Sequence, residues 1–128
     1  MDGYSVKIRE SSKKLTVKEM LAAKDFSNAV SIDTALEGND SLIINPDYYA
    51  ILDVHNERSK NEKDYVKYIV IDKSGTKYTT GSNSFFTSFE DIFKTMQENA
   101  PDEDYSIECL RKPSKNYAGK TFITCSIV

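Results

Sequence analysis

The sequence predicts a mainly β domain in which one long helix lies between the third and fourth strands. Three observations lead to this fold class. Residues 48–80 hold three runs rich in β-branched and aromatic residues, which favour strands. Residues 85–98 repeat apolar side chains at helical spacing, and residues 105–128 return to strand-like patterns. The length of 128 residues favours a single domain of this kind.

Residues 1–47 differ in pattern from the rest of the chain. They contain one predicted short helix, which begins near Thr16 because Glu19 follows at the spacing of a capping box. Turn-forming residues and short apolar stretches follow it. We interpret 1–47 as an N-terminal extension that supplies an arm, an extra strand or a contact between copies of the chain. Residues 48–128 form the predicted domain.

Three strands open this domain. In "YYAILDVHN", residues 48–56, Ala50, Leu52 and Val54 alternate with residues that point to the other side. The run "YVKYIVID" is the second predicted strand and "TKYTTGS" is the third. The intervening "KSG" predicts a tight turn, because glycine adopts backbone angles that other residues avoid.

The helix that follows has clear boundaries in the sequence. Capping-box spacing places its start at Thr87 with Glu90, or at Ser88 with Asp91. The sequence Asn-Ala-Pro at 99–101 ends it. Its apolar side is aromatic and is interpreted as core: Phe85, Phe89, Ile92, Phe93 and Met96.

Two strands complete the domain. Ile107 and Cys109 share one face of "YSIECLR", and Ile123 and Cys125 share one face of "KTFITCSIV". The two cysteines form no CxxC pair and no metal-spaced cluster, so we interpret them as buried thiols in a reducing compartment.

The predicted order of strands and helix is that of the OB-fold, a five-stranded Greek-key barrel with a helix between strands three and four. This fold binds oligonucleotides through its middle strands and through the loops that join strands one to two and four to five. Here those loops are "ERSKNEKD" and "RKPSKNYAGK", and both are longer than a simple chain reversal requires.

Charge is unevenly distributed along the chain. The total is −3, but residues 58–80 and 105–128 each carry +3, whereas residues 1–57 and 81–104 carry −4 and −5. Local clusters of cations matter more for a polyanionic partner than the total charge does.

Single-stranded nucleic acids are bound by cations that contact phosphates and by aromatic rings on which bases stack. The cationic candidates are Arg58, Lys60, Lys67, Lys77, Lys112, Lys115 and Lys120. The aromatic candidates are Tyr65, Tyr78, Tyr117 and Phe122. By strand alternation, Tyr65 and Phe122 share faces with polar residues. Tyr78 is placed on the other face, but a β-bulge would reverse this assignment. For each tyrosine, ordinary strand packing is an equal alternative.

The C-terminal half resembles a known family. The stretches "KYTTGSNSFFTSFEDIFKTM" and "KPSKNYAGKTFITCSIV" are similar to single-stranded DNA-binding proteins encoded by phages and conjugative plasmids of Gram-positive bacteria. The resemblance covers about residues 65–128. It implies an OB-fold that coats single-stranded DNA during replication, recombination or transfer in the bacterial host. The residues in the matching motifs are Lys77, Tyr78, Lys115, Tyr117, Lys120 and Phe122.

We therefore expect a single-stranded DNA-binding protein without sequence preference, with RNA left open as a ligand. It would be no enzyme and would use no cofactor or metal, because His55 is the only histidine and no nucleophile motif accompanies it. We expect a homodimer or larger homo-oligomer, for which an N-terminal arm is a common means. We also expect a location in the cytoplasm, because no apolar run reaches the ~18 residues of a membrane span and the N-terminus lacks the apolar stretch of a secretory signal. The alternative is a protein–protein adaptor on the same barrel.

Overall fold

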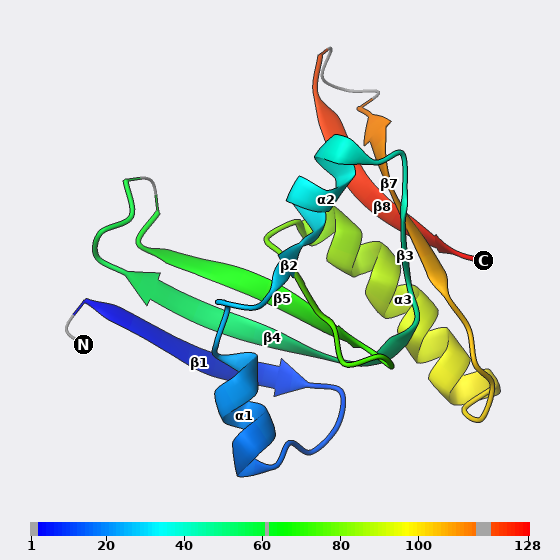
Figure 1. Ribbon diagram of the computed structural model, residues 1–128, viewed down its shortest axis with the longest axis horizontal. Helices are drawn as coiled ribbons and strands as arrows, with labels where there is room; N and C mark the ends of the chain where they lie inside the picture. The colour runs from blue at the N-terminus through cyan, green and yellow to red at the C-terminus, as the bar shows by residue number, and fades with distance from the viewer. Residues whose placement is uncertain (1–2, 61, 115–118) are drawn as a thin grey trace. The chain divides into compact units, whose positions relative to one another are not determined.

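The computed structural model describes residues 3–60, 62–114 and 119–128. The chain forms mostly strands, with helices between some of them (Figure 1). In order, they are β1 (Tyr4–Ser11), α1 (Val17–Ala23), β2 (Val30–Ser31), α2 (Ile32–Gly38), β3 (Leu42–Ile44), β4 (Pro46–Asn56), β5 (Asp64–Asp72), β6 (Lys77–Thr80), α3 (Asn83–Asn99), β7 (Ile107–Pro113) and β8 (Thr121–Ile127). The predicted class, mainly β with helices, is confirmed at this level.

The strands form two sheets. One has the order β1-β4-β5-β6-β2 and the other has the order β3-β7-β8. The chain divides into two compact units, of which the first contains residues 1–30 and 47–81 and the second contains residues 31–46 and 82–128. Within the described residues β8 pairs only with β7, so the pairings define two open sheets. Closure into one barrel stays a prediction.

Strand β1 is the main element that the predicted pattern lacks. It pairs antiparallel with β4, placing Val6 opposite Val54 and Ile8 opposite Leu52. A shift in register follows Ile8. The alternation of Tyr4, Val6 and Ile8 with polar residues is a strand signal that could have identified it. The N-terminal 47 residues thus supply β1 and α1 to the first unit, and α2 and β3 to the second.

In the first unit, α1 begins where the capping box predicts. The Thr16 Oγ1 accepts a hydrogen bond from the Glu19 backbone N–H at 3.1 Å, and the Glu19 carboxylate accepts one from the Thr16 N–H at 2.9 Å. Ala23 of this helix packs against a buried cluster on the sheet, formed with Ala50, Leu52 and Ile69. The strand face predicted from residues 50 to 54 is therefore the core face.

In the second unit, α3 begins five residues before the predicted Thr87. Its N-cap is Ser82, whose hydroxyl accepts a hydrogen bond from the Phe85 N–H at 3.1 Å. The predicted caps at Thr87 and Ser88 are wrong, because both lie inside the helix and donate their hydroxyls to carbonyls four residues earlier. The extra turn buries Phe85 and Phe86. The predicted end at Asn99 is confirmed.

The aromatic side of α3 is core, as predicted. The rings of Phe85 and Phe89 stack with centroids 5.9 Å apart, and Phe93 follows at 5.6 Å from Phe89.

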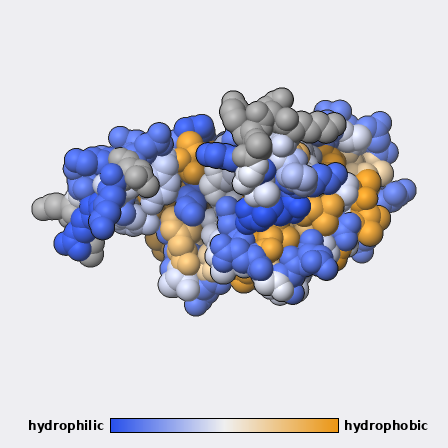
Figure 2. Space-filling view, turned by 90° about the horizontal axis from the view of Figure 1, so that it is seen from above, coloured by the Kyte–Doolittle hydropathy of each residue, from blue (hydrophilic) through white to orange (hydrophobic). Residues whose placement is uncertain are grey.

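Several large apolar side chains stay exposed elsewhere, and on the face seen in Figure 2 hydrophobic residues reach the surface between hydrophilic ones. The most exposed are Val17, Leu21, Ile43, Ile127 and Val128.

Candidate nucleic-acid interface

The β7–β8 hairpin presents two different faces. Ile107, Cys109, Ile123 and Cys125 are buried and share one face by strand alternation. The opposite face carries Phe122, which is 38% exposed. On this face Phe122 pairs directly with Lys112, an exposed residue of β7. An aromatic ring and a cation therefore stand side by side on a surface of the second unit.

This aromatic-cation pair lies toward the tip of the hairpin. Leu110 and Thr124 form the next pair on the same face. At the other side the Ser114 N–H donates to the Lys120 carbonyl at 2.8 Å, so Lys120 lies at the end of the ladder, with an exposed side chain. Two predicted site residues, Lys115 and Tyr117, lie outside the described residues. We call Lys112, Lys120 and Phe122 the hairpin face.

Lys77 is engaged in a structural contact. Its ammonium group donates hydrogen bonds to the carbonyls of Ala22 and Asp25, the latter at 2.7 Å. These carbonyls lie at the C-terminal end of α1, where a cation is favourable. Lys77 therefore stabilises the docking of α1, a role that the sequence pattern did not indicate.

The other predicted residues of the first sheet do not share one face. Tyr65 and Lys67 lie on the same face of β5 as Ile69, which belongs to the buried cluster under α1, and both are half-buried. Tyr78 pairs with Val70 of β5 and therefore lies on the opposite face. These three side chains cannot form one stacking surface on this sheet.

Positive and negative charges balance in residues 57–64, which are the β4–β5 loop and the first residue of β5. Arg58 and Lys60 are exposed, as expected for phosphate contacts. However, residues 57–64 contain as many carboxylates as cations. Lys63 pairs with Glu57 at 3.2 Å. Neighbouring carboxylates therefore offset the cations of this segment.

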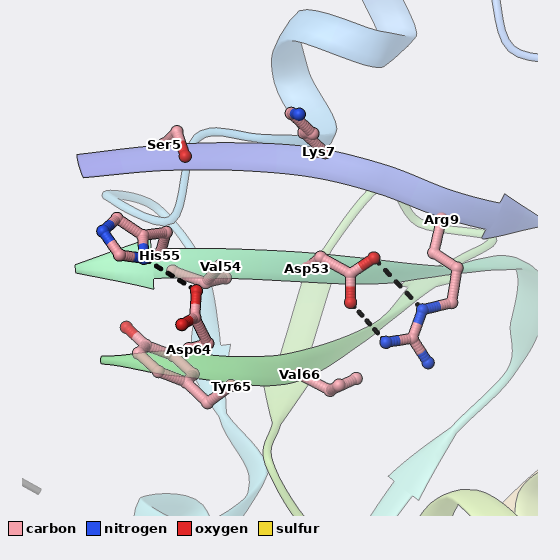
Figure 3. Close-up of a pocket in the computed structure, with 9 residues that line it drawn as sticks. All are labelled: Ser5, Lys7, Arg9, Asp53, Val54, His55, Asp64, Tyr65 and Val66. Atoms are coloured by element: carbon pink, nitrogen blue, oxygen red, sulfur yellow. Dashed lines mark hydrogen bonds and ion pairs between the residues drawn. The ribbon is translucent and has the colours of Figure 1, made fainter. Parts of the chain in front are cut away.

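A groove of about 430 Å³ crosses β1, β4 and β5 in the first unit (Figure 3). Its lining residues are Ser5, Lys7, Arg9, Asp53, Val54, His55, Asp64, Tyr65 and Val66. Arg9 forms a two-point contact with Asp53, with Nε at 3.1 Å from Oδ2. Asp53 raises the pKa of Arg9, through this hydrogen bond and through its charge. Lys7 and Arg9 were missed as candidate cations because β1 was not predicted.

His55 lies between two carboxylates in this groove. Its Nδ1 is 2.7 Å from Asp64 Oδ1 and its Nε2 is 2.7 Å from Glu57 Oε1. An ionised carboxylate only accepts hydrogen bonds, so the protonated ring, in which both nitrogens donate, is the form that satisfies both contacts. The contact with Asp64, followed by that with Glu57, raises the pKa of His55. Among the described residues no His, Cys, Asp and Glu side chains are arranged so that they could hold a metal ion. His55 forms ion pairs with Asp64 and Glu57 when its ring is protonated, and Lys63 also pairs with Glu57.

Comparison of the chain with protein-family models, with curated proteins and with solved structures finds no match. The resemblance in residues 65–128 therefore stays an expectation from short motifs.

In the described part of the chain, no helix is long and apolar enough to span a membrane.

Proposed function

We propose that the chain binds single-stranded DNA without sequence preference, with the hairpin face as its main contact. The observation that carries this proposal is the pairing of Phe122, 38% exposed, with the exposed Lys112 directly across the strand ladder. Every base offers a flat face that stacks on an aromatic ring, and the adjacent phosphates are attracted to ammonium groups. Lys120, two residues before Phe122, supplies a second cation at the same end of the hairpin.

The surroundings of Phe122 support this role. Each stacking contact contributes about 1–3 kcal/mol, so one ring with two or three cations gives useful affinity for a long polynucleotide. Glu108 is the only carboxylate among the described residues of β7 and β8, and it lies four positions from Lys112. The lysines of the hairpin face therefore have no acidic neighbour on their own strands that would compete with phosphate.

Residues of the first unit make a smaller contribution in this proposal. Arg58 and Lys60 are exposed and remain candidates for phosphate contacts. Lys77 is a weak candidate because its ammonium group is held by two carbonyl groups. Tyr65, Lys67 and Tyr78 are weak candidates because they are half-buried and divided between two faces of the sheet.

The proposed fold is a variant of the OB-fold. The order β4, β5, β6, α3, β7, β8 is the strand-strand-strand-helix-strand-strand order of that fold. One residue, Asn45, separates β3 from β4. We treat β3 and β4 together as the long first strand of the fold. In an OB-fold this strand pairs with the second and the fourth strand, and here β4 pairs with β5 and β3 pairs with β7. Self-association, and action in the cytoplasm of a bacterial host during replication, recombination or transfer, belong to the same proposal.

A second candidate function is binding of a protein partner. Helix α1 leaves two large apolar side chains in solvent, Val17 at 72% and Leu21 at 64% exposure. An exposed apolar surface of this kind favours a protein contact. This candidate predicts no affinity for nucleic acid, so direct binding separates the two.

The experiment is a fluorescence anisotropy titration of a labelled dT oligomer with the full chain. We expect binding that weakens with salt, and a loss of about 5- to 150-fold in affinity for Phe122→Ala, the range of one stacking contact. Tyr4→Ala is the matched control, because Tyr4 is an equally exposed aromatic residue, at 40%, on the first sheet. An equal loss of affinity in both variants, or no loss in Phe122→Ala, would show that the hairpin face is not the main contact with DNA. No binding at any salt concentration would favour the protein partner.

A further inference from the structure

The two cysteines lie directly opposite each other on neighbouring strands. Cys109 of β7 pairs with Cys125 of β8, and both are free thiols in the buried face of the hairpin. The proposed nucleic-acid contact uses neither of them. Whether their sulfurs can be joined depends on the type of pair they occupy in the ladder.

The ladder hydrogen bonds identify this pair type. The Ser114 N–H donates to the Lys120 carbonyl at 2.8 Å, and the Val128 N–H donates to the Ser106 carbonyl at 3.0 Å. In an antiparallel ladder, hydrogen-bonded and non-hydrogen-bonded pairs alternate. Counting along the printed register from either end, Cys109 and Cys125 form a non-hydrogen-bonded pair.

The spacing of such a pair suits a disulfide bond. The Cα atoms of a non-hydrogen-bonded pair lie roughly 4.5 Å apart, with side chains closer than in the other type. A disulfide requires Cα atoms about 4.4–6.8 Å apart and Cβ atoms that approach each other. Since both side chains lie on the same face, no change of register is needed to bring the sulfurs together.

We propose that Cys109 and Cys125 form a reversible intramolecular disulfide when the protein meets a small-molecule disulfide such as oxidised glutathione. Cys125, as its thiolate, attacks one sulfur of the oxidant, and the S–S bond of the oxidant breaks to release one thiolate. Cys109, as its thiolate, then attacks the Cys125 sulfur of the mixed disulfide and displaces the second thiolate. The two protons lost by the cysteines end on the two released thiols, so the protein is oxidised by two electrons and the oxidant is reduced by two.

Burial sets the order and the rate of these steps. Cys125 is 7% exposed and Cys109 is fully buried, so Cys125 is the thiol that meets the oxidant first. Burial also raises the pKa of both thiols to about 12, which keeps them protonated at neutral pH. Only the thiolate attacks a disulfide. Oxidation is therefore slow at neutral pH and faster at higher pH.

The bond would tie the two strands together beneath the hairpin face. The thiols and Phe122 lie on opposite faces of the ladder, so the disulfide leaves the ring uncovered. Its formation is independent of the proposed binding of DNA and can be tested without nucleic acid.

The experiment uses the full chain, reduced and then equilibrated with oxidised glutathione at neutral and alkaline pH. Free thiols are counted by alkylation in denaturant, and intact mass identifies the product. We expect both thiols to disappear together, with the mass falling by two hydrogen atoms, and reducing agent to restore both. A parallel reaction in denaturant verifies that the oxidant is active.

The matched control keeps two thiols but moves one to the other face, by combining Cys125→Ser with Ser126→Cys. This variant should accumulate glutathione adducts or intermolecular dimers and little intramolecular disulfide. Persistent free thiols in the native wild type at alkaline pH, a stable mixed disulfide on one cysteine, or dimers as its main product would overturn the proposal. If the control fails to fold, the thiol count and mass of the wild type decide it.

Discussion

Phe122 of β8 lies directly opposite Lys112 of β7, on the face of the hairpin that points away from its buried cysteines. The β-ladder therefore keeps an aromatic ring and an ammonium group side by side. This relationship combines the two ingredients that single-strand binding requires.

Removing the ammonium group at this position should change the salt dependence of DNA binding. For a single strand, each phosphate contact contributes about −0.7 to the slope of log affinity against log salt concentration. Lys112→Ala should therefore flatten the slope by about 0.7, measured by anisotropy with a dT oligomer. Lys18→Ala on α1 is the control and should leave the slope unchanged. An unchanged slope in Lys112→Ala would mean that this residue contacts no phosphate.

The aromatic residues of core and surface should differ in their effect on stability. Phe89 is fully buried within the stripe of α3, so Phe89→Ala should lower the free energy of unfolding by about 3–5 kcal/mol. Phe122→Ala should lower it far less, because much of that ring is already in solvent. Urea denaturation followed by circular dichroism measures both. A comparable loss in the two variants would show that Phe122 is part of the core.

The N-cap of α3 can be tested in the same way. Ser82→Ala removes the hydroxyl that accepts the Phe85 N–H and should cost about 1 kcal/mol of stability. Thr87→Ala should be neutral or slightly stabilising, because alanine is a better helix former at an exposed position inside a helix. A larger loss of stability in Thr87→Ala than in Ser82→Ala would instead place the N-cap at Thr87, as the capping-box spacing predicts.

The contacts of His55 make the stability of the first unit dependent on pH. Asp64 and Glu57 raise the pKa of His55 in the folded state. Their stabilising effect is therefore complete below the ordinary histidine pKa of about 6.5. It is lost as the pH rises through the higher pKa of the folded state. Wild type should therefore lose stability relative to His55→Gln between near-neutral and alkaline pH. The check is urea denaturation across this range, at low salt so that screening stays small.

Asp64→Asn is the informative control for this effect. It removes the largest cause of the raised pKa and should weaken the pH dependence while His55 is kept. Glu57 acts with the opposite sign, because His55 and Lys63 lower its pKa, so its contribution is lost as the pH falls through the acidic range. Identical pH profiles in wild type and His55→Gln would contradict this account.

Local patterns were sufficient to predict several elements and to name the three residues of the hairpin face as candidates. Alternation along residues 48–56 identified the core face of β4, and the Thr16–Glu19 spacing identified the start of α1, because both signals depend only on residues near in sequence. The same alternation placed Phe122 on the polar face of the last strand, where it is exposed. Alternation along a strand and spacing along a helix predict which face a side chain lies on, because the backbone geometry repeats within one element.

Contacts between distant segments were not predictable from such patterns. Lys77 was expected to contact DNA, but it caps α1 through a carbonyl group 55 residues away. The cap of α3 moved to Ser82 because burial of Phe85 and Phe86 extends the helix by a turn, although the local spacing favours a later start. The opposition of Cys109 and Cys125 depends on the register of β7 and β8.

The amino-acid sequence by itself determined which residues alternate, which segments form the main strands and the long helix, and where cations and rings are available, since these properties follow from backbone periodicity and side-chain chemistry. Only the tertiary structure decided which of those side chains remain available to a ligand. That decision depends on partners brought together by folding, such as Asp53 for Arg9, two carboxylates for His55 and two helix-end carbonyls for Lys77.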